Sequence, residues 1–278
     1  MDAWKNGKLY RSEELTVSAY DHGFLYGLGF FETFRTYDGQ VFLFDEHWKR
    51  LSHALADFRM AMPYDKETIL AAIKVLTKEN DGEDGYFRLN ISAGIHDIGL
   101  QPSHYEKPTV ILFRKALHFA PRGTEKAAVW LKTARNTPES ADRHKSHHFA
   151  NNIQARFEVE SMAMYEGVFL TADGFVAEGI TSNVFWAKDG KIYTPSLATG
   201  ILPGITREWI IHKFQVEEGL FTKELLETAD EVFITNSVQE IVPIKEIDGK
   251  PFLGNNGSVY TMVHNAYVKC VQEERTIR

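Results

Sequence analysis

One lysine near the middle of the chain stands in an unusual setting. The segment from Arg143 to Glu158 reads RHKSHHFANNIQARFE, so three histidines and two arginines lie close to Lys145 in the sequence. Such a segment could provide a metal site, a basic patch for nucleic acid, or a single reactive amine. Most lysines are ordinary surface residues, so the choice depends on the rest of the sequence.

The first two possibilities find no support elsewhere in the chain. His144 and His148 are four residues apart, but no HExxH pattern and no neighbouring acidic ligand accompanies them. The formal net charge is −7, whereas nucleic-acid binders usually carry a basic excess. Cys270 is the only cysteine, which excludes an intramolecular disulfide and a thiolate metal cage. We therefore expect no metal and no nucleic-acid partner.

The composition is that of an ordinary globular protein. The chain has 278 residues, of which 44% are hydrophobic and 25% are charged. The N-terminal stretch MDAWKNGKLYRSEE is polar, and no stretch approaches the roughly 20 apolar residues of a membrane span. We expect a cytoplasmic protein with no membrane partner.

Residues downstream of Lys145 could act together with its amine. Glu178 follows an apolar run in DGFVAEGITSNVFW, where a carboxylate can face a site. In LPGITRE, the Pro-Gly pair precedes a predicted helix, whose first N–H groups, at Ile205 and Thr206, can bind an anion. Ser237, in the turn of TNSVQEIVP, and Arg50 could complete a phosphate site. An amine, a carboxylate and a phosphate cradle are what pyridoxal phosphate requires.

Turn signals and periodicity indicate the elements that carry these residues. Predicted hairpins outnumber strand–helix–strand patterns, which favours mixed or antiparallel sheets with packed helices, an α+β or mixed α/β fold. A helix is expected from Asp45, its predicted N-cap, with apolar residues at helical spacing, and another over residues 149–164. The hairpin turns are expected at Asn6-Gly7, Asp38-Gly39, Asp173-Gly174 and Asp189-Gly190.

The regular spacing of apolar residues ends around HFAPRGTEK, which suggests a linker between two domains. We expect a small α/β domain over residues 1–117, a linker over 118–126, and a larger cofactor-binding domain over 127–278.

The order and spacing of the motifs resemble the fold-type-IV pyridoxal-phosphate enzymes, also called class IV aminotransferases. This family includes branched-chain aminotransferases, D-amino-acid aminotransferases and aminodeoxychorismate lyases. The resemblance covers nearly the whole chain, and DHGFLYG, NTPE…KSHH and TNSVQEIVP look most like the lyases. It is carried by DHGFLYGLGFFETFR, EHWKRL, HKSHH, VAEGITSNVFW, LPGITR and DEVFITNSVQEIVP.

This resemblance implies two domains with mixed sheets, the cofactor at the domain boundary, and a homodimer with residues from both subunits at each site. It implies that Lys145 is the Schiff-base lysine and that Glu178 is the partner of the pyridine nitrogen. The phosphate ligands that it implies are Arg50, Ile205, Thr206 and Ser237. Cationic neighbours and partial burial are then expected to lower the pKa of Lys145.

The segment NISAGIHDIG departs from the transaminases of this family. Ala93 and Ile98 stand where D-amino-acid aminotransferases carry arginines that grip a substrate carboxylate, and Phe31 replaces a tyrosine. Arg88 and His96 are the nearby cationic candidates for substrate binding. We therefore expect a lyase that converts 4-amino-4-deoxychorismate, a small molecule, into 4-aminobenzoate and pyruvate for folate biosynthesis. A branched-chain or D-amino-acid aminotransferase is the first alternative, and a non-catalytic protein of this fold is the second.

Overall fold

The computed structural model describes residues 2–80, 82–100, 104–118 and 120–277. The chain divides into two compact units. The first comprises Met1–His118, His144–His148 and Glu274–Arg278, and the second comprises Phe119–Arg143 and Phe149–Glu273. The segment that carries Lys145 therefore belongs to the first unit, although its neighbours in sequence belong to the second. The predicted domains and linker follow a different division and stay a prediction; residue 119 of that linker lies outside the described residues.

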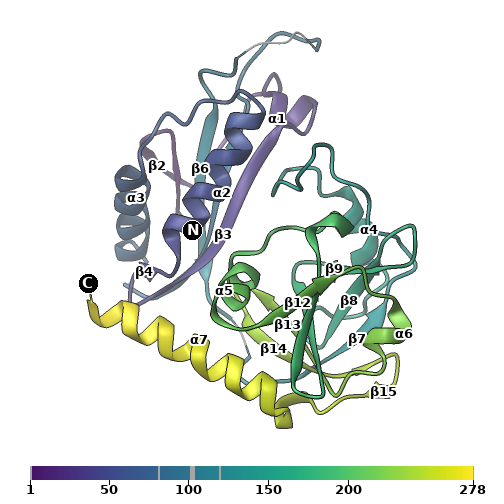
Figure 1. Ribbon diagram of the computed structural model, residues 1–278. Coiled ribbons are helices and arrows are strands. Elements are labelled where there is room, and N and C mark those ends of the chain that lie inside the picture. Colours follow the sequence, from purple (N-terminus) through teal and green to yellow (C-terminus); the bar gives the residue numbers. More distant parts are fainter. Residues whose placement is uncertain (1, 81, 101–103, 119, 278) are drawn as a thin grey trace. The chain divides into compact units, whose positions relative to one another are not determined.

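The first unit is built on an antiparallel sheet with the strand order β2-β1-β6-β5-β3-β4. Two long helices, α2 and α3, lie against one face of this sheet (Figure 1). The elements are β1 (Asp2–Lys5), β2 (Lys8–Arg11), α1 (His22–Leu25), β3 (Gly29–Tyr37), β4 (Gln40–Val41), α2 (Phe44–Asp57), α3 (Lys66–Lys78), β5 (Gly85–Ser92) and β6 (Thr109–Ala116).

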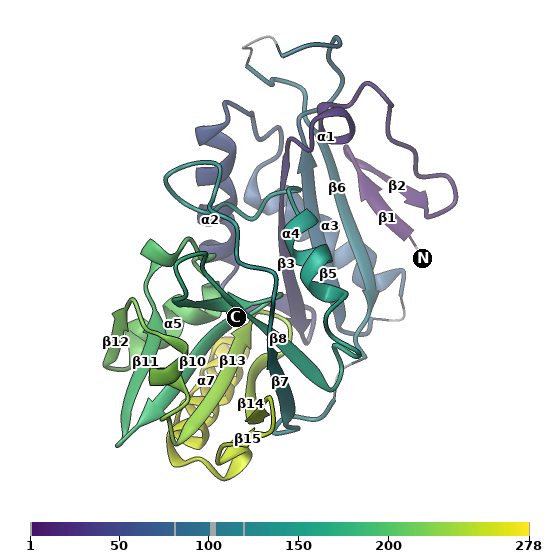
Figure 2. The ribbon, with the colours of Figure 1, turned by 90° about the vertical axis from the view of Figure 1, so that its right-hand side faces the viewer.

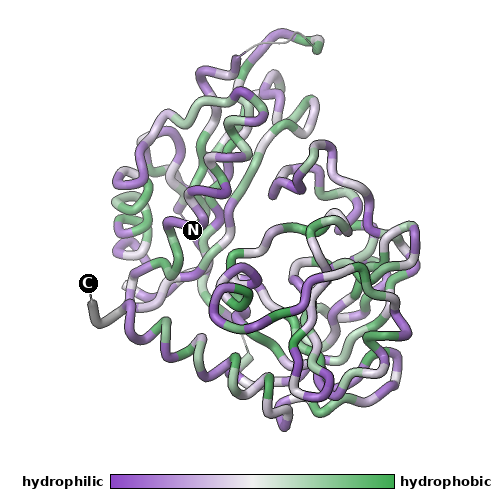
Figure 3. Tube along the Cα trace, in the orientation of Figure 1, coloured by the Kyte–Doolittle hydropathy of each residue, from purple (hydrophilic) through white to green (hydrophobic). Residues whose placement is uncertain are grey.

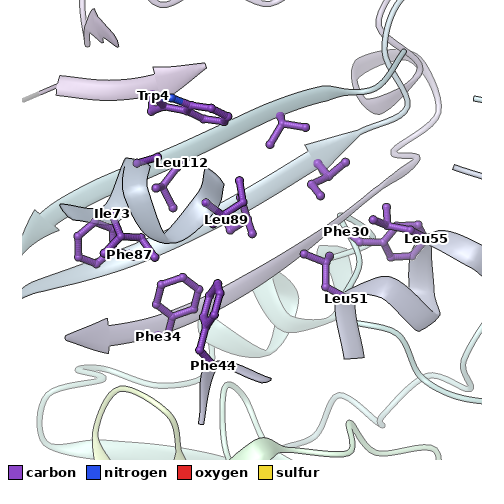
Figure 4. Packing of buried hydrophobic residues seen from close by; sticks show 14 of the residues in the cluster. Trp4, Phe30, Phe34, Phe44, Leu51, Leu55, Ile73, Phe87, Leu89 and Leu112 are labelled. Carbon is purple, nitrogen blue, oxygen red and sulfur yellow. The ribbon is translucent and has the colours of Figure 1, made fainter. Parts of the chain in front are cut away.

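The core of the first unit forms between this sheet and its helices. Phe30, Phe34, Phe87 and Leu89 point from the strands toward Leu51 and other apolar residues of the helices (Figure 4). Alternate residues of a strand share one face, whereas residues three or four apart share one face of a helix, so both patterns deliver apolar side chains to the same layer. This packed layer holds β3 rigidly, and β3 in turn carries the residues around Lys145.

The second unit contains a mixed sheet with the order β12-β11-β10-β13-β14-β7-β8-β9, in which β15 pairs with β14. Figure 2 shows its strands side by side, and α5 contacts β13. The strands are β7 (Lys126–Trp130), β8 (Tyr165–Leu170), β9 (Val176–Gly179), β10 (Asn183–Lys188), β11 (Lys191–Pro195), β12 (Val216–Gly219), β13 (Glu231–Asn236), β14 (Glu240–Ile247) and β15 (Lys250–Pro251). The helices are α4 (Ala150–Arg156), η1 (Leu197–Thr199), α5 (Ile205–Lys213), α6 (Lys223–Leu226), η2 (Gly254–Asn256) and α7 (Ser258–Ile277).

Helix α7, which is not among the predicted elements, is fixed at its start by a buried carboxylate. Glu231 on β13 accepts hydrogen bonds from the backbone N–H groups of Val259 and Tyr260, at 3.1 and 2.7 Å. These N–H groups have no partner within the helix, so the carboxylate acts as a cap. Figure 3 shows apolar and polar residues alternating along this helix, as its one-sided burial requires.

The fold class is confirmed: both sheets are antiparallel or mixed and helices pack on them, rather than a doubly wound parallel sheet. Three predicted turns have positive φ at both central residues, at Asn6-Gly7, Asp38-Gly39 and Asp189-Gly190. This is the geometry of the tight hairpin turn that Asn-Gly and Asp-Gly favour. The hairpin around Gly174 also forms, with a longer loop between β8 and β9.

Two helix boundaries were predicted wrongly. The N-cap of α2 is Leu43 rather than Asp45, because the buried Phe44 already belongs to the helix and Asp45 instead accepts from Lys66 Nζ at 2.5 Å. The helix expected over residues 149–164 ends at Arg156. Beyond it, the Glu158 carboxylate binds the backbone N–H groups of residues 132 and 133, a tertiary contact that the periodicity does not reveal.

The structure contains, within its described residues, no helix that is long and apolar enough to cross a membrane.

Candidate functional site

The backbone around Lys145 is attached to the start of β3. The Phe31 N–H donates to the Lys145 carbonyl, and the His147 N–H donates to the Gly29 carbonyl, both at 2.9 Å. A Cβ atom on Gly29 would collide with the His147 ring, so only glycine allows this approach. Backbone pairing with a rigid strand therefore fixes the position from which the Lys145 side chain projects.

The Lys145 amine lies against an aromatic ring that Arg88 also contacts. Nζ lies 4.7 Å from the centre of the Phe31 ring, and the Arg88 guanidinium lies 3.5 Å from the same centre. His147 Nε2 donates to Asn90 Oδ1 at 2.9 Å. Burial, with a smaller contribution from Arg88, lowers the pKa of His147 to about 4, so its ring is neutral at pH 7. Arg88 and Lys145 therefore both place a cationic group against the Phe31 ring.

Arg50 on α2 is held by a buried carboxylate. Its Nε and Nη2 donate to the two oxygens of Glu32 on β3, at 2.8 and 2.7 Å, and His47 Nδ1 is 2.7 Å from Glu32 Oε2. Burial lowers the pKa of His47, so we take its ring as neutral and as a donor to Glu32. This fork-shaped pairing fixes the guanidinium in one orientation. The role of Arg50 as a phosphate ligand stays a prediction.

Glu32 is expected to make the stability of the protein sensitive to acid. Burial alone would raise the pKa of its carboxyl, but Arg50 and His47 outweigh burial and lower it from 4.5 to about 2. A lowered folded-state pKa stabilises the fold above the unfolded value, so this contribution, roughly 3 kcal/mol, should disappear as the pH falls from about 4.5 to about 2. Urea unfolding of Glu32→Gln and wild type at several pH values should show the gap between them narrowing over this window.

The matched control for that experiment is Glu106→Gln, which removes an exposed carboxylate of the same unit. Its stability should stay close to that of wild type at every pH. A gap for Glu32→Gln that is the same at pH 2 and pH 7 would show that the ion pair does not stabilise the fold.

The histidines near Lys145 have separate partners. His144 Nε2 lies 2.8 Å from Asp57 Oδ2, and His53 Nε2 lies 3.7 Å from the same oxygen. Donor atoms of these three residues lie within 4.8 Å of one another. His147 bonds to Asn90 instead, so the histidines of the HKSHH motif do not converge on one point. His144 ties the lysine segment to the end of α2.

In the second unit, Glu178 on β9 is buried among hydrogen-bond donors. Its side chain accepts from Arg135 Nε at 2.8 Å, from the Leu202 N–H at 3.0 Å and from Asn183 Nδ2 at 3.4 Å. The residue is 4% exposed. These three donors fix the orientation of the buried carboxylate.

The start of α5 lies close to this carboxylate. Its N-cap is Gly204, which provides no capping side chain, so the first N–H groups of the helix, at Ile205 and Thr206, can serve an anion. Asn183, whose amide donates to Glu178 and to the Leu202 carbonyl, pairs across the sheet with Thr235. The hydroxyls of Thr206 and Thr235 are both buried without a hydrogen-bond partner. Two such hydroxyls beside a helix N-terminus are what a phosphate group would satisfy.

Ser237 lies in the turn between β13 and β14. The side chain of Asn236 accepts from the N–H groups of Val238 and Gln239, at 3.0 and 2.7 Å, and thereby shapes this turn. Ser237 itself is half-buried. Ser237 follows Thr235 by two residues, so it lies at the end of β13 where Thr235 pairs with Asn183.

Each compact unit therefore brings some predicted site residues together. The first gathers Lys145, Phe31 and Arg88, and the second gathers Glu178, Ile205 and Thr206. The His96 ring packs against the rings of His22 and Tyr105, with distances of 5.1 and 4.7 Å between ring centres. The residues that the sequence did not indicate are Glu32, Arg135, Asn183 and Thr235.

Comparisons with known proteins show the family to which the chain belongs. Residues 29–247 match the family described as amino-transferase class IV, and the chain belongs to that family. The chain is 44% identical over 271 residues to an aminodeoxychorismate lyase of Bacillus subtilis (strain 168), covering 95% of this chain and 92% of that protein. It is 30% identical to a D-alanine aminotransferase of Staphylococcus epidermidis, with 96% of each chain covered. The predicted family is thus confirmed.

Solved structures share the fold. A branched-chain aminotransferase from the thermophilic archaeon Thermoproteus uzoniensis, solved with norvaline, is 28% identical to this chain and has a TM-score of 0.88. The match covers 99% of this chain and 96% of that chain.

Proposed function

We propose that this protein is a pyridoxal-phosphate-dependent lyase that converts 4-amino-4-deoxychorismate into 4-aminobenzoate and pyruvate, a step of folate biosynthesis. The observation that carries the proposal is the 44% identity to the Bacillus subtilis lyase over 95% of this chain. The described residues suit pyridoxal phosphate, because the first unit supplies an amine and the second supplies a buried carboxylate and an anion cradle.

The residues fit this cofactor. The orphaned hydroxyls of Thr206 and Thr235 and the N-terminus of α5 suit its phosphate, and Glu178 suits the proton of its ring nitrogen. Arg50, Ile205, Thr206 and Ser237 are proposed as phosphate ligands, with Lys145 forming the covalent link.

The bound cofactor supplies an electron sink for a carbanion at the carbon that bears the substrate amine. Lys145, released from its covalent link when the substrate amine takes its place, would act as the general base that removes the proton from this carbon. Glu178 would accept a hydrogen bond from the N–H of the ring nitrogen. Cleavage of the bond between the neighbouring carbon and the enolpyruvyl oxygen would then make the substrate ring aromatic and give 4-aminobenzoate. The released enolpyruvate would take up a proton at its methylene carbon to become pyruvate.

Substrate binding favours the lyase over a transaminase. Ala93 is fully buried and Ile98 is 73% exposed, and neither can grip a carboxylate. Arg88, which contacts the same Phe31 ring as Lys145, is the proposed partner of a substrate carboxylate. The aminodeoxychorismate ring carries two carboxylates, so its binding can be distributed over Arg88, His96 and other polar groups, whereas a small amino acid depends on one clamp.

The test is incubation with aminodeoxychorismate and no keto acid, followed by quantification of both products. Equal, multiple-turnover amounts of 4-aminobenzoate and pyruvate are expected. We expect catalytic efficiency at least roughly a thousandfold above that for D-alanine or L-leucine, since a missing clamp costs several kcal/mol. Activity that requires 2-oxoglutarate and forms glutamate would instead support an aminotransferase, the function that the 30% identity to the D-alanine enzyme favours. A protein that turns over none of these substrates would be a non-catalytic member.

We also propose a cytoplasmic homodimer. An exposed apolar surface in the first unit supports the dimer: α1 and the segment that follows β5 are joined by the Asp21–Ile95 bridge and present Phe24 and Ile95, 73% and 66% exposed. A second copy would cover such a patch. Sedimentation should show a dimer for wild type and a monomer for Phe24→Glu, and a monomeric wild type would contradict the proposal.

A further inference from the structure

The buried carboxylate of Glu178 has a buried cationic partner that the proposed reaction does not yet use. Arg135 is 8% exposed, and its Nε lies 2.8 Å from Glu178 Oε1. A charge-assisted hydrogen bond of this kind, away from water, is strong and holds its geometry.

The Arg135 guanidinium is itself held in place on its other side. Its Nη1 donates to the side-chain oxygens of Asn136, Asn151 and Asn152, at 3.2, 2.8 and 3.2 Å. The guanidinium also lies 5.1 Å from the centre of the Phe169 ring. Because α4 supplies two of these asparagines, the helix fixes where the charge of Arg135 sits.

The donors on Glu178 leave capacity for one more. An ionised carboxylate accepts about four hydrogen bonds. The Leu202 N–H and the Asn183 amide take up Oε2, and Arg135 takes one position on Oε1. The carboxylate would thus have one acceptor position for the N–H of a protonated pyridine ring.

We propose that Arg135 is a positioning residue that keeps Glu178 an ionised acceptor, so that the proton of the buried pair stays on the ring nitrogen of the cofactor. This inference rests on the proposed function. In a buried carboxylate–pyridine pair, the proton can lie on either partner, and low polarity favours the neutral arrangement. A guanidinium fixed on the carboxylate favours the charged arrangement, which the electron sink needs.

Arg143 is a second cation near this carboxylate. Burial, and next the charge of Arg135, lower its pKa to about 10, so it stays charged at neutral pH. Its guanidinium donates to the carbonyls of Gly200 and Asn136. Arg135 therefore makes the direct contact with Glu178, and Arg143 adds charge without that hydrogen bond.

The first experiment tests the pair in the cofactor-free protein. Arg135→Met and Glu178→Gln should each lower Tm by several degrees, because each leaves a buried partner unpaired. The double variant should lose no more than the larger single loss. If the Tm losses of the two single variants add in the double variant, the pairing is overturned. Arg135→Gln replaces Arg135→Met if the methionine variant does not fold.

The second experiment reads the proton directly. Wild type loaded with pyridoxal phosphate that carries ¹⁵N in its ring should give the NMR signal of a protonated nitrogen. In Arg135→Met the signal should move to that of an unprotonated nitrogen, and Arg135→Lys should restore much of the wild-type signal. Arg122→Met, which removes another guanidinium from a buried glutamate, Glu240, should leave the signal unchanged. A protonated signal in Arg135→Met would overturn the inference.

The two proposals fail in different ways. If wild type forms no 4-aminobenzoate but shows a protonated nitrogen that depends on Arg135, the lyase assignment fails and the role of Arg135 holds. If wild type is an active lyase and the protonation of the ring nitrogen does not depend on Arg135, the lyase assignment holds and the role of Arg135 fails. A wild type that takes up no cofactor overturns both.

Discussion

Replacement of Lys145 by alanine is expected to reduce turnover by at least about a thousandfold, because the same amine is the proposed covalent ligand and the proposed general base. The fold should persist. The lysine segment is held by backbone hydrogen bonds to Gly29 and Phe31, which do not depend on the side chain at position 145. Steady-state kinetics and circular dichroism of the variant, with borohydride reduction and peptide mapping of wild type, provide the measurement.

Lys74→Ala is the matched control, since this lysine lies on the exposed face of α3. It should retain wild-type turnover and cofactor content. Mapping of the reduced cofactor to Lys132 or Lys191, or a Lys145→Ala variant with normal turnover, would show that the nucleophile lies elsewhere.

Glu178→Gln is expected to lower turnover by two to three orders of magnitude, roughly what the loss of one preorganised electrostatic partner costs. Affinity for the cofactor should change much less, because the phosphate cradle at the start of α5 remains intact. The carboxylate matters mainly for charge that develops during proton removal, so its loss appears in kcat rather than in binding. Cofactor titration and single-turnover kinetics separate the two effects.

Glu227→Gln, on a half-buried glutamate of the same unit that accepts from Trp130, serves as the control for the loss of one carboxylate. It should turn over normally. If Glu178→Gln instead loses its cofactor while the rate per bound cofactor stays normal, Glu178 has a structural role and another group stabilises the developing charge.

Local patterns predicted much of the fold. The Asn6-Gly7, Asp38-Gly39 and Asp189-Gly190 pairs placed three hairpins, because these dipeptides tolerate the positive φ that a tight turn demands. The spacing of Leu51 and Leu55 predicted the buried face of α2. The turn dipeptides and the helical spacing depend only on residues close together in the sequence, so they can be recognised without knowledge of the tertiary structure.

Helix ends were less predictable. Asp45 has the chemistry of a cap but pairs with Lys66, and the helix after Phe149 stops where Glu158 binds the backbone of residues 132 and 133. In both cases a side chain binds a partner that is distant in the sequence. Whether such a contact forms depends on closing a long loop, which a local sequence pattern does not indicate.

For the site, the sequence by itself determined the residue types and their order: the amine at position 145, the carboxylate at 178, and a helix start at 205 that can bind an anion. Only the tertiary structure placed the Lys145 segment on β3 of the first unit, set Glu32 on Arg50, and set Arg135 on Glu178. It also left the hydroxyls of Thr206 and Thr235 buried and unpaired. These features arise from pairings between residues far apart in the chain, such as Arg50 with Glu32 and Lys145 with Phe31. Burial decides their strength, and burial is a property of the folded chain alone.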